Sequence, residues 1–173
     1  MSSSIDKKIY DQGIKRGLSP TVANLLVAQA RFESADYTSN VFKQNTNLFG
    51  YKFVGQAGAT RGTEAPRSEW PSATVKGYYA KYKSVEDSTN EVIAWLFRRE
   101  KEGKFRVNEL TTAGKYAAGL KSGNYYGSSA AEYGNGLIAK LKKIDFNSGP
   151  GANMAGALPI LIFVGLALSL FKR

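Results

Sequence analysis

The sequence predicts a protein of the α+β class that is mostly α-helical, with one small β-hairpin lobe and a C-terminal transmembrane helix. Three observations predict this: capped segments with helical apolar spacing, a glycine-rich stretch between aromatic and β-branched residues, and an apolar run behind a Gly/Pro segment. The chain has 173 residues, enough for one domain with a sizeable core. We expect residues 1–147 to form that domain, 148–154 to be a linker, and 155–171 to cross a membrane.

Two helices are predicted before the glycine-rich stretch. Residues 5–18 carry apolar side chains at positions 5, 9, 14 and 18, which indicates the first helix. Ser19 followed by Pro20 is typical of a helix cap and a first helical residue, and apolar residues continue at helical spacing as far as Phe32.

The β lobe is predicted in the middle of the chain. Residues 51–53 and 74–82 are rich in aromatic and β-branched side chains, which favour strands. Gly55, Gly58 and Gly62 lie between the two stretches and favour turns. We therefore predict a β-hairpin or small sheet whose strands are these two stretches.

Three further helices are predicted after the lobe. Ser84 with its following acidic residues resembles a capping box, and the apolar face behind it extends to Phe97. Residues 110–120 form a weaker helical pattern. Residues 129–144 form a clear one, with a stripe at positions 130, 133, 137, 141 and 144.

The C-terminal segment has the character of a membrane span. No charged residue lies between positions 146 and 171, and 155–171 is apolar on all faces apart from Ser169. A helix of that length is roughly 26 Å long, and the uncharged residues before it extend the segment past the ~30 Å hydrocarbon core of a bilayer. A buried core helix is the alternative, but the Gly/Pro-rich linker separates the run from the domain. We therefore predict a membrane anchor, with lipid as a partner.

The amino-acid composition limits the kinds of catalytic and metal-binding site that the chain can form. The chain contains no Cys and no His, which excludes disulfides, thiol nucleophiles, Ser-His-Asp triads and zinc sites built on those residues. Acid–base chemistry must therefore use Glu, Asp, Tyr or Lys, and no metal or other cofactor is expected. With 24 Lys+Arg against 14 Asp+Glu, the net charge of +10 favours anionic partners. No nucleic-acid-binding module is recognisable, so nucleic acid is not predicted as a partner.

Two short strings carry most of the functional information. The string AQARFES at 28–34 places Glu33 at the end of an apolar helix. Hydrophobic surroundings there would favour the neutral carboxyl that a general acid needs. The string NLFGYK at 47–52 is consistent with an Asn-initiated turn before a strand, although packing alone does not require it.

Together these strings resemble the glucosaminidase family of peptidoglycan hydrolases, glycoside hydrolase family 73, which includes bacterial autolysins, the flagellar rod hydrolase and phage lysins. The similarity continues through 63–64, 79–84 and the tyrosine-rich block at 115–133, and it covers about residues 18–144. It implies a lysozyme-like helical domain with a substrate cleft against a small β lobe. It also implies hydrolysis of β-1,4 bonds in the glycan strands of peptidoglycan.

The resemblance assigns roles to particular residues. Glu33 is the expected general acid that protonates the glycosidic oxygen. Glu64 is the best match for the second carboxylate, with Glu69 as the alternative. Tyr126 is the expected catalytic tyrosine, with Tyr125 as its alternate, because the family's Tyr-Ala-Thr-Asp string is not preserved. Residues expected to bind substrate are Asn47, Phe49, Tyr51, Trp70, Tyr82 and Tyr125.

The sequence also leads to an expectation for the location of the protein. The polar residues 1–8 are followed by no apolar run, so a signal peptide is not expected. An enzyme that attacks the wall must act outside the cytoplasmic membrane, which a C-terminal anchor alone does not achieve in the host. We expect a component of a membrane-containing phage particle that opens the wall during entry beside other virion proteins. The bacterial envelope is the alternative location. A lytic transglycosylase and a non-catalytic wall-binding or structural membrane protein are the alternative functions.

Overall fold

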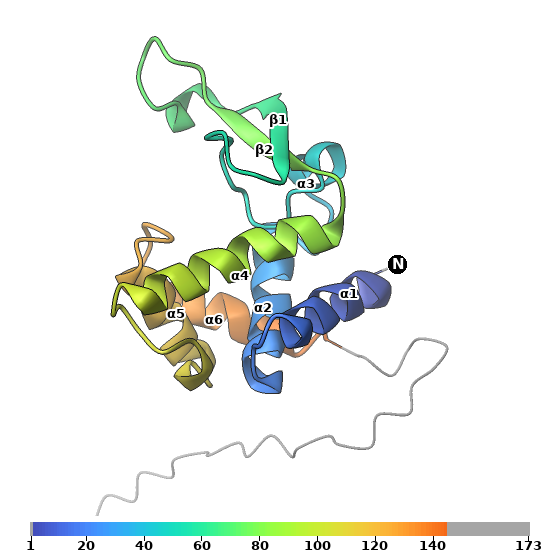
Figure 1. Cartoon of the computed structure of the whole chain (residues 1–173), viewed down its shortest axis with the longest axis vertical. Helices are drawn as coiled ribbons and strands as arrows, with labels where there is room; N and C mark the ends of the chain where they lie inside the picture. The colour runs from blue at the N-terminus through green and yellow to red at the C-terminus, as the bar shows by residue number, and fades with distance from the viewer. Residues whose placement is uncertain (1, 145–173) are drawn as a thin grey trace, which may run out of the picture.

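The helices make up most of the domain, and the β lobe stands on one side of them (Figure 1). The computed structural model describes residues 2–144, so the predicted linker and membrane helix lie outside the described residues. No helix within the described range is long and apolar enough to span a bilayer. In chain order the elements are α1 (Ser2–Lys15), α2 (Pro20–Glu33), α3 (Asn40–Asn45), β1 (Ala59–Glu64), the 3₁₀ turn η1 (Arg67–Glu69), β2 (Tyr78–Tyr82), α4 (Val85–Lys101), the 3₁₀ turn η2 (Val107–Glu109), α5 (Ala113–Ser122) and α6 (Ala130–Leu141).

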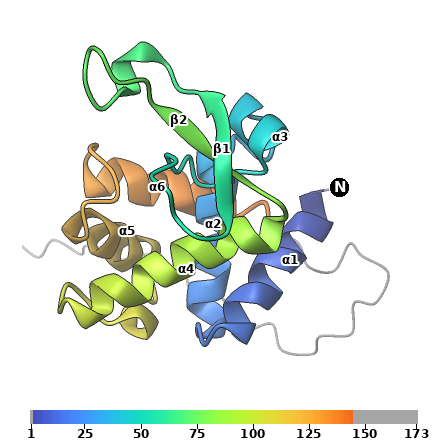
Figure 2. The ribbon, with the colours of Figure 1, turned by 45° about the horizontal axis from the view of Figure 1, so that its top comes forward.

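Helix α2 is the centre of the core. It contacts α1, α5 and α6, and its residues from Leu25 to Arg31 are all buried. Helix α4 crosses the helical part on the side that faces the lobe, and it also contacts α1 (Figures 1 and 2). The core is aliphatic where these helices meet, since Leu26, Leu96 and Leu137 are fully buried. Because α2 is held on several sides, its last residue has a fixed position beneath the lobe.

The structure confirms that α2 and α4 begin after the predicted caps Ser19 and Ser84, and α6 also begins after a capping serine. The Ser19 hydroxyl accepts from the Val22 backbone N–H, and Ser129 forms a complete capping box with Glu132. Such caps satisfy backbone donors that the helix leaves free.

The ends of three predicted helices differ from the structure, and α6 ends at Leu141, earlier than the predicted residue 144. Helix α1 ends at Lys15, because Gly17 adopts a φ of 92° and the Leu18 amide turns back to the Gly13 carbonyl at 3.0 Å. Helix α5 begins at Ala113, later than expected, after a separate 3₁₀ turn. The six-residue α3 was not predicted.

The β lobe is a two-stranded antiparallel hairpin, as predicted, but one of its strands was misplaced. Strand β2 lies within the expected stretch, whereas its partner β1 comes from the glycine-rich segment and pairs Arg61 with Ala80. The predicted strand 51–53 instead runs along the other edge of β2, where the Phe53 amide donates to the Tyr78 carbonyl at 2.8 Å. Strand β1 has no buried side-chain stripe, so its sequence shows no apolar alternation.

Two asparagines fasten the lobe to the segment that follows α2. Asn45 donates to the Thr63 hydroxyl at 2.7 Å and accepts from the Thr63 amide at 3.0 Å. Asn47 donates to the Ala80 carbonyl at 2.9 Å. Gly62 is needed at this contact, since a Cβ there would lie 2.3 Å from the Asn45 carboxamide oxygen. Figure 2 shows α3 beside the hairpin, where these contacts join them.

Candidate active site

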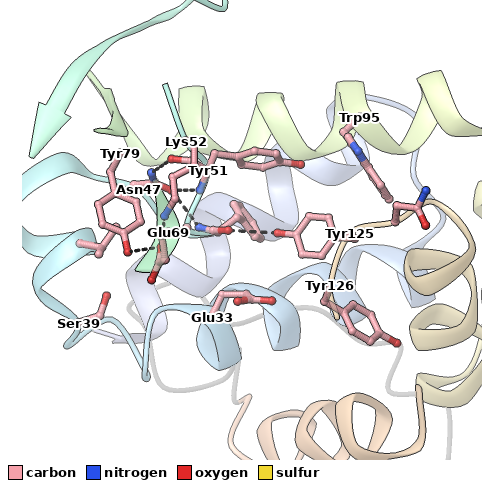
Figure 3. Close-up of a pocket in the computed structure, with 14 residues that line it drawn as sticks. Glu33, Ser39, Asn47, Tyr51, Lys52, Glu69, Tyr79, Trp95, Tyr125 and Tyr126 are labelled. Carbon is pink, nitrogen blue, oxygen red and sulfur yellow. Dashed lines mark hydrogen bonds and ion pairs between the residues drawn. The ribbon is translucent and has the colours of Figure 1, made fainter. Parts of the chain in front are cut away.

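A cleft of about 480 Å³ lies between the end of α2, the 47–52 loop, the hairpin and the α5–α6 loop (Figure 3). Both strings singled out in the sequence contribute to it. Its lining residues are Glu33, Ser39, Val41, Asn47, Phe49, Gly50, Tyr51, Lys52, Glu69, Tyr79, Trp95, Asn124, Tyr125 and Tyr126.

Glu33 is the last residue of α2 and reaches the cleft from the helical side. Its side chain is half-buried, and Oε1 accepts a 2.5 Å hydrogen bond from the hydroxyl of Tyr133 on α6. Burial raises the pKa of Glu33 above 4.5, and the Tyr133 hydrogen bond offsets part of that rise. The carboxyl is therefore in surroundings that favour the protonated form.

The chain leaves Glu33 through an unusual left-handed turn. Ala35, Asp36 and Tyr37 have φ values of 52°, 54° and 68°. A left-handed conformation costs roughly 1–2 kcal/mol for each residue that carries a Cβ. Ser34 supports the turn, because its hydroxyl donates to the Ala30 carbonyl at 2.6 Å and accepts from the Tyr37 amide at 3.0 Å.

A buried ionic network holds this turn against α1. Asp6 has no exposed surface and receives two short bonds from Arg31, at 2.9 Å and 2.6 Å, and a third at 2.5 Å from the Tyr37 hydroxyl. Paired charges of this kind are stable away from water only when their hydrogen bonds are satisfied. Glu33 thus sits between two anchored residues, Arg31 before it and Tyr37 after it.

Asp36 connects the same turn to α6. Its carboxylate contacts Lys140 at 2.7 Å and Lys143 at 3.1 Å. Burial raises the pKa of Asp36, but the two lysines outweigh burial and bring the pKa below 3.8. The helix that carries Tyr133 is therefore tied by its far end to the turn that follows Glu33.

The two predicted tyrosines of the α5–α6 loop have different surroundings. Tyr126 stacks on Tyr133, with ring centroids 4.0 Å apart and planes 5° from parallel, and its hydroxyl donates to the Ala117 carbonyl at 2.7 Å. That hydroxyl points away from Glu33 (Figure 3). Tyr125 donates to the Phe49 carbonyl at 3.3 Å and so closes the cleft between the two loops.

The two candidate second carboxylates lie in different places. Glu69 lines the cleft from the lobe side, forms an ion pair with Lys52 and accepts from the Tyr79 hydroxyl at 3.0 Å. The Lys52 contact is the main reason that the pKa of Glu69 lies below 4.5. Glu64 is exposed at the end of β1, pairs with Lys76 at 2.9 Å and is not among the cleft residues.

Some of the predicted substrate-binding residues line the cleft, and others lie outside it. Phe49, Tyr51 and Asn47 line the cleft together with Tyr125. The Asn47 amide is already engaged, because it donates to two backbone carbonyls and accepts from two backbone amides.

The other two predicted substrate-binding residues, Trp70 and Tyr82, are not among the cleft residues. The Trp70 indole instead donates to the Ala65 carbonyl at 2.9 Å. The contact between Tyr133 and Glu33 was not predicted, because Tyr133 reads in the sequence as part of an apolar helical stripe. Within residues 2–144, no three acidic side chains gather as a metal site would require.

Comparisons with known proteins agree with this architecture. A glucosaminidase family model, described as mannosyl-glycoprotein endo-beta-N-acetylglucosaminidase, matches residues 13–146. No curated protein sequence matches the chain significantly.

The solved structures that share the fold include those of three bacterial proteins. The catalytic domain of the autolysin Auto from Listeria monocytogenes is 23% identical, with a TM-score of 0.56 over 84% of this chain and 82% of that one. A peptidoglycan hydrolase from Sphingomonas sp. A1 is 19% identical, with a TM-score of 0.59 over 88% and 99%. A glycoside hydrolase domain of FlgJ from Salmonella typhimurium is 20% identical, with a TM-score of 0.55 over 83% and 97%.

Proposed function

We propose that this chain, which belongs to the glucosaminidase family (glycoside hydrolase family 73), hydrolyses β-1,4 glycosidic bonds in the glycan strands of peptidoglycan. The observation that carries the proposal is the half-buried Glu33 in the cleft, whose pKa is raised by burial. Glycosidic bond cleavage needs a carboxyl whose protonated form is favoured by its surroundings as its acid. Two structural neighbours, a peptidoglycan hydrolase and the catalytic domain of an autolysin, support the choice of substrate.

In the proposed reaction Glu33 acts as the general acid. Tyr133 occupies Oε1, and Oε2 makes no hydrogen bond within the described residues. A glycosidic oxygen placed at Oε2 would take the proton as its bond to the anomeric carbon breaks. The sugar that remains carries positive charge in the transition state, which a nearby carboxylate stabilises.

Glu69 is the better candidate for that second carboxylate. The resemblance favoured Glu64, but Glu69 lines the cleft and Glu64 does not. The Lys52 ammonium and the Tyr79 hydroxyl keep Glu69 ionised, which suits a base for water or an electrostatic stabiliser. The aromatic rings of Tyr51 and Tyr125 offer apolar faces for sugar rings in the same cleft.

Product analysis of digested cell walls tests the proposal. The full-length protein is incubated with purified sacculi, and the released fragments are identified by mass spectrometry, with Glu33→Gln as the inactive control. Reducing sugar ends identify a hydrolase and show which bond is cut. Anhydro ends would identify the transglycosylase alternative instead. Binding to sacculi without products would contradict enzymatic function and favour a wall-binding protein.

We also propose that residues 155–171 anchor the protein in a membrane, and that this is the membrane of a phage particle used for entry. The support is the uncharged apolar run behind the linker, together with the net charge of +10, which attracts the domain to the anionic wall. The full chain should float with liposomes, whereas a chain that ends at residue 147 should stay soluble and active.

The phage assignment needs its own measurement. Detergent extraction of purified particles should release the protein and the wall-degrading activity together with the viral lipid. Finding the protein only in envelopes of uninfected bacteria would contradict the virion assignment and leave the enzymatic proposal intact.

A further inference from the structure

Most neutral polar side chains of the cleft are already bonded to the protein itself. The Tyr125 and Tyr126 hydroxyls donate to backbone carbonyls, and the Asn47 carboxamide donates to two carbonyls and accepts from two amides. The Tyr79 hydroxyl donates to a carboxylate, and the Tyr51 hydroxyl is sealed from solvent. These side chains therefore have no hydrogen left to donate to a bound sugar.

Trp95 and Asn124 line the cleft with their hydrogen-bonding groups unused. Neither the Trp95 indole nor the Asn124 carboxamide makes a hydrogen bond within the described residues. Trp95 is buried, but its Nε1 is still reached by solvent, unlike the Tyr51 hydroxyl. On the lobe side, Ser39 also keeps a free hydroxyl hydrogen, because its Oγ only accepts, from the Phe42 amide. A free donor in a cleft wall gains a hydrogen bond when a ligand supplies the acceptor.

The fold holds Trp95 and Asn124 at the same place. Asn124 lies between Gly123 and Tyr125, and both of these neighbours pack against Trp95. The Tyr125 and Trp95 ring centroids are 5.2 Å apart in an edge-to-face arrangement, and a Cβ on Gly123 would lie 2.6 Å from the Trp95 ring. Asn124 has a φ of 59°, a left-handed conformation that asparagine tolerates better than most residues. The carboxamide therefore lies next to the indole.

The two ends of the cleft differ in charge. Figure 3 shows Lys52 and Glu69 at one end, Trp95 at the other, and Glu33 between them. Apart from Glu33, Lys52 and Glu69 are the charged residues that line the cleft, and they pair with each other. The Trp95 end is lined by aromatic rings and neutral polar groups. It therefore suits a neutral ligand group better than an ion.

An acetamido group matches the hydrogen-bonding groups at this end. Its carbonyl oxygen accepts and its N–H donates, whereas an indole N–H only donates and a carboxamide does both. Its methyl group is apolar and suits contact with the aromatic rings. A free amine in its place offers no carbonyl to the indole, and its positive charge finds no carboxylate there.

We propose that Trp95 and Asn124 form a subsite for the acetamido group of an N-acetylated sugar, and that they set a preference for acetylated over de-N-acetylated glycan strands. The inference rests on the proposed function, which makes this cleft the glycan-binding site. The Trp95 indole N–H donates to the acetamido carbonyl, and Asn124 Oδ1 accepts from the acetamido N–H. A de-N-acetylated sugar leaves the indole donor unpaired.

Affinity measurements with paired ligands test the subsite. The full-length protein carries Glu33→Gln, so that strands are bound but not cut, and Kd is measured for soluble glycan fragments before and after chemical de-N-acetylation. Trp95→Phe removes the N–H and keeps an aromatic ring beside Tyr125. It should weaken binding of the acetylated fragments by about tenfold, the upper value for one neutral hydrogen bond. Binding of the de-N-acetylated fragments should change by less than about twofold, because they lack the acceptor.

Asn124→Asp tests the same subsite with a change of charge. It keeps the size of the side chain and tolerates the left-handed backbone. Its carboxylate should pair with the ammonium of de-N-acetylated fragments and tighten their binding by about fivefold, the upper value for an exposed ion pair. Asn135→Asp is the matched control, because Asn135 is an exposed asparagine on α6 that does not line the cleft. It makes the same change in net charge and should leave both affinities unchanged.

Two results would overturn the subsite: a folded Trp95→Phe variant whose preference for acetylated fragments is unchanged, or an Asn135→Asp variant that behaves like Asn124→Asp. Thermal melting checks the folding of each variant, and the exposed Asn124→Asp change decides the question if Trp95→Phe does not fold. Either result leaves Glu33 in its proposed role. If the protein with Glu33 intact releases no fragments from sacculi, the proposed function itself fails, so the two failures are distinguishable.

Discussion

The helical part and the β lobe meet at one cleft, but the helical part contains a buried ion pair, whereas the ion pair at the end of the lobe's strand β1 is exposed. In the helical part, the Arg31 and Asp6 side chains are 7% and 0% exposed. In the lobe, the Lys76 and Glu64 side chains are 55% and 42% exposed. Charge interactions are strong in the first setting and weakened by water in the second.

A glycosidase needs one protonated carboxyl as its acid and one ionised carboxylate, and the two regions provide surroundings that suit these two states. Burial on the helical side raises the pKa of Glu33, whereas Lys52 on the lobe side lowers the pKa of Glu69. When the surroundings raise the pKa of one carboxyl and lower the pKa of the other, the first is favoured as a proton donor and the second as an ionised carboxylate. We infer that each half of the molecule supplies one of the two states.

Replacing Glu33 by Gln should have the greatest consequence, because it removes the transferable proton with little change of shape. Activity on sacculi should fall by about 10²–10⁴-fold. In the wild type, activity should disappear as the pH rises through the raised pKa of Glu33, since only the protonated form donates. Turnover measured across pH checks both points, and a loss of only about tenfold would show that Glu33 is not the general acid.

Replacing Asp6 by Asn should be the most destabilising change, because it removes the close ion pair of the buried Arg31 guanidinium and leaves it only the longer, 3.3 Å contact with Asp36. Breaking such a pair costs about 3–5 kcal/mol of unfolding free energy. Glu64→Gln removes an exposed pair as its control and should cost at most about 1 kcal/mol. Denaturant unfolding of both variants gives the comparison, and equal losses would mean that the two regions do not differ in this respect.

The two lobe carboxylates should differ in catalysis. Glu69→Gln should lower activity by about 100-fold, the lower end of what a catalytic carboxyl contributes, because it removes the ionised group in the cleft. Glu64→Gln should leave activity near that of the wild type. The same zymogram or fragment assay measures both, and the reverse order would restore Glu64 to the role that the family resemblance implies.

Glu33→Gln should also make the protein slightly more stable at neutral pH. The folded pKa of Glu33 lies above the unfolded value, so ionising the buried carboxyl opposes folding as the pH rises through that folded value. A glutamine avoids this cost. The melting temperatures of variant and wild type should therefore converge below pH 4.5 and separate above the folded pKa. A variant that is less stable at every pH would mean that the ionised carboxylate is well accommodated.

Much of the helical part could be predicted from sequence, because caps and apolar spacing are local signals. Ser19, Ser84 and Ser129 mark the starts of helices through bonds to backbone amides three residues later. The position of Glu33 at the end of an apolar helix could also be recognised. Strand β1 could not, since its side chains lie mostly in solvent and its Gly62 is needed for a close approach to Asn45.

The contacts of the site could be predicted least. Tyr133 looks like any other member of the α6 stripe, and nothing local distinguishes a tyrosine that packs from one that also bonds to Glu33. Glu64 and Glu69 differ by five positions, yet η1 turns only the second into the cleft. Such choices depend on how distant segments meet, which short-range patterns do not encode.

The long separation between Glu33 and Tyr133 has a consequence for the protein as it is being made. The bond spans 100 residues of sequence, and the Lys140–Asp36 bond spans 104. A chain emerging from the ribosome exposes α2 long before α6 has been translated, so the unfinished protein lacks both contacts. The proposed acid Glu33 and its partner Tyr133 are therefore brought together only once α6 has left the ribosome.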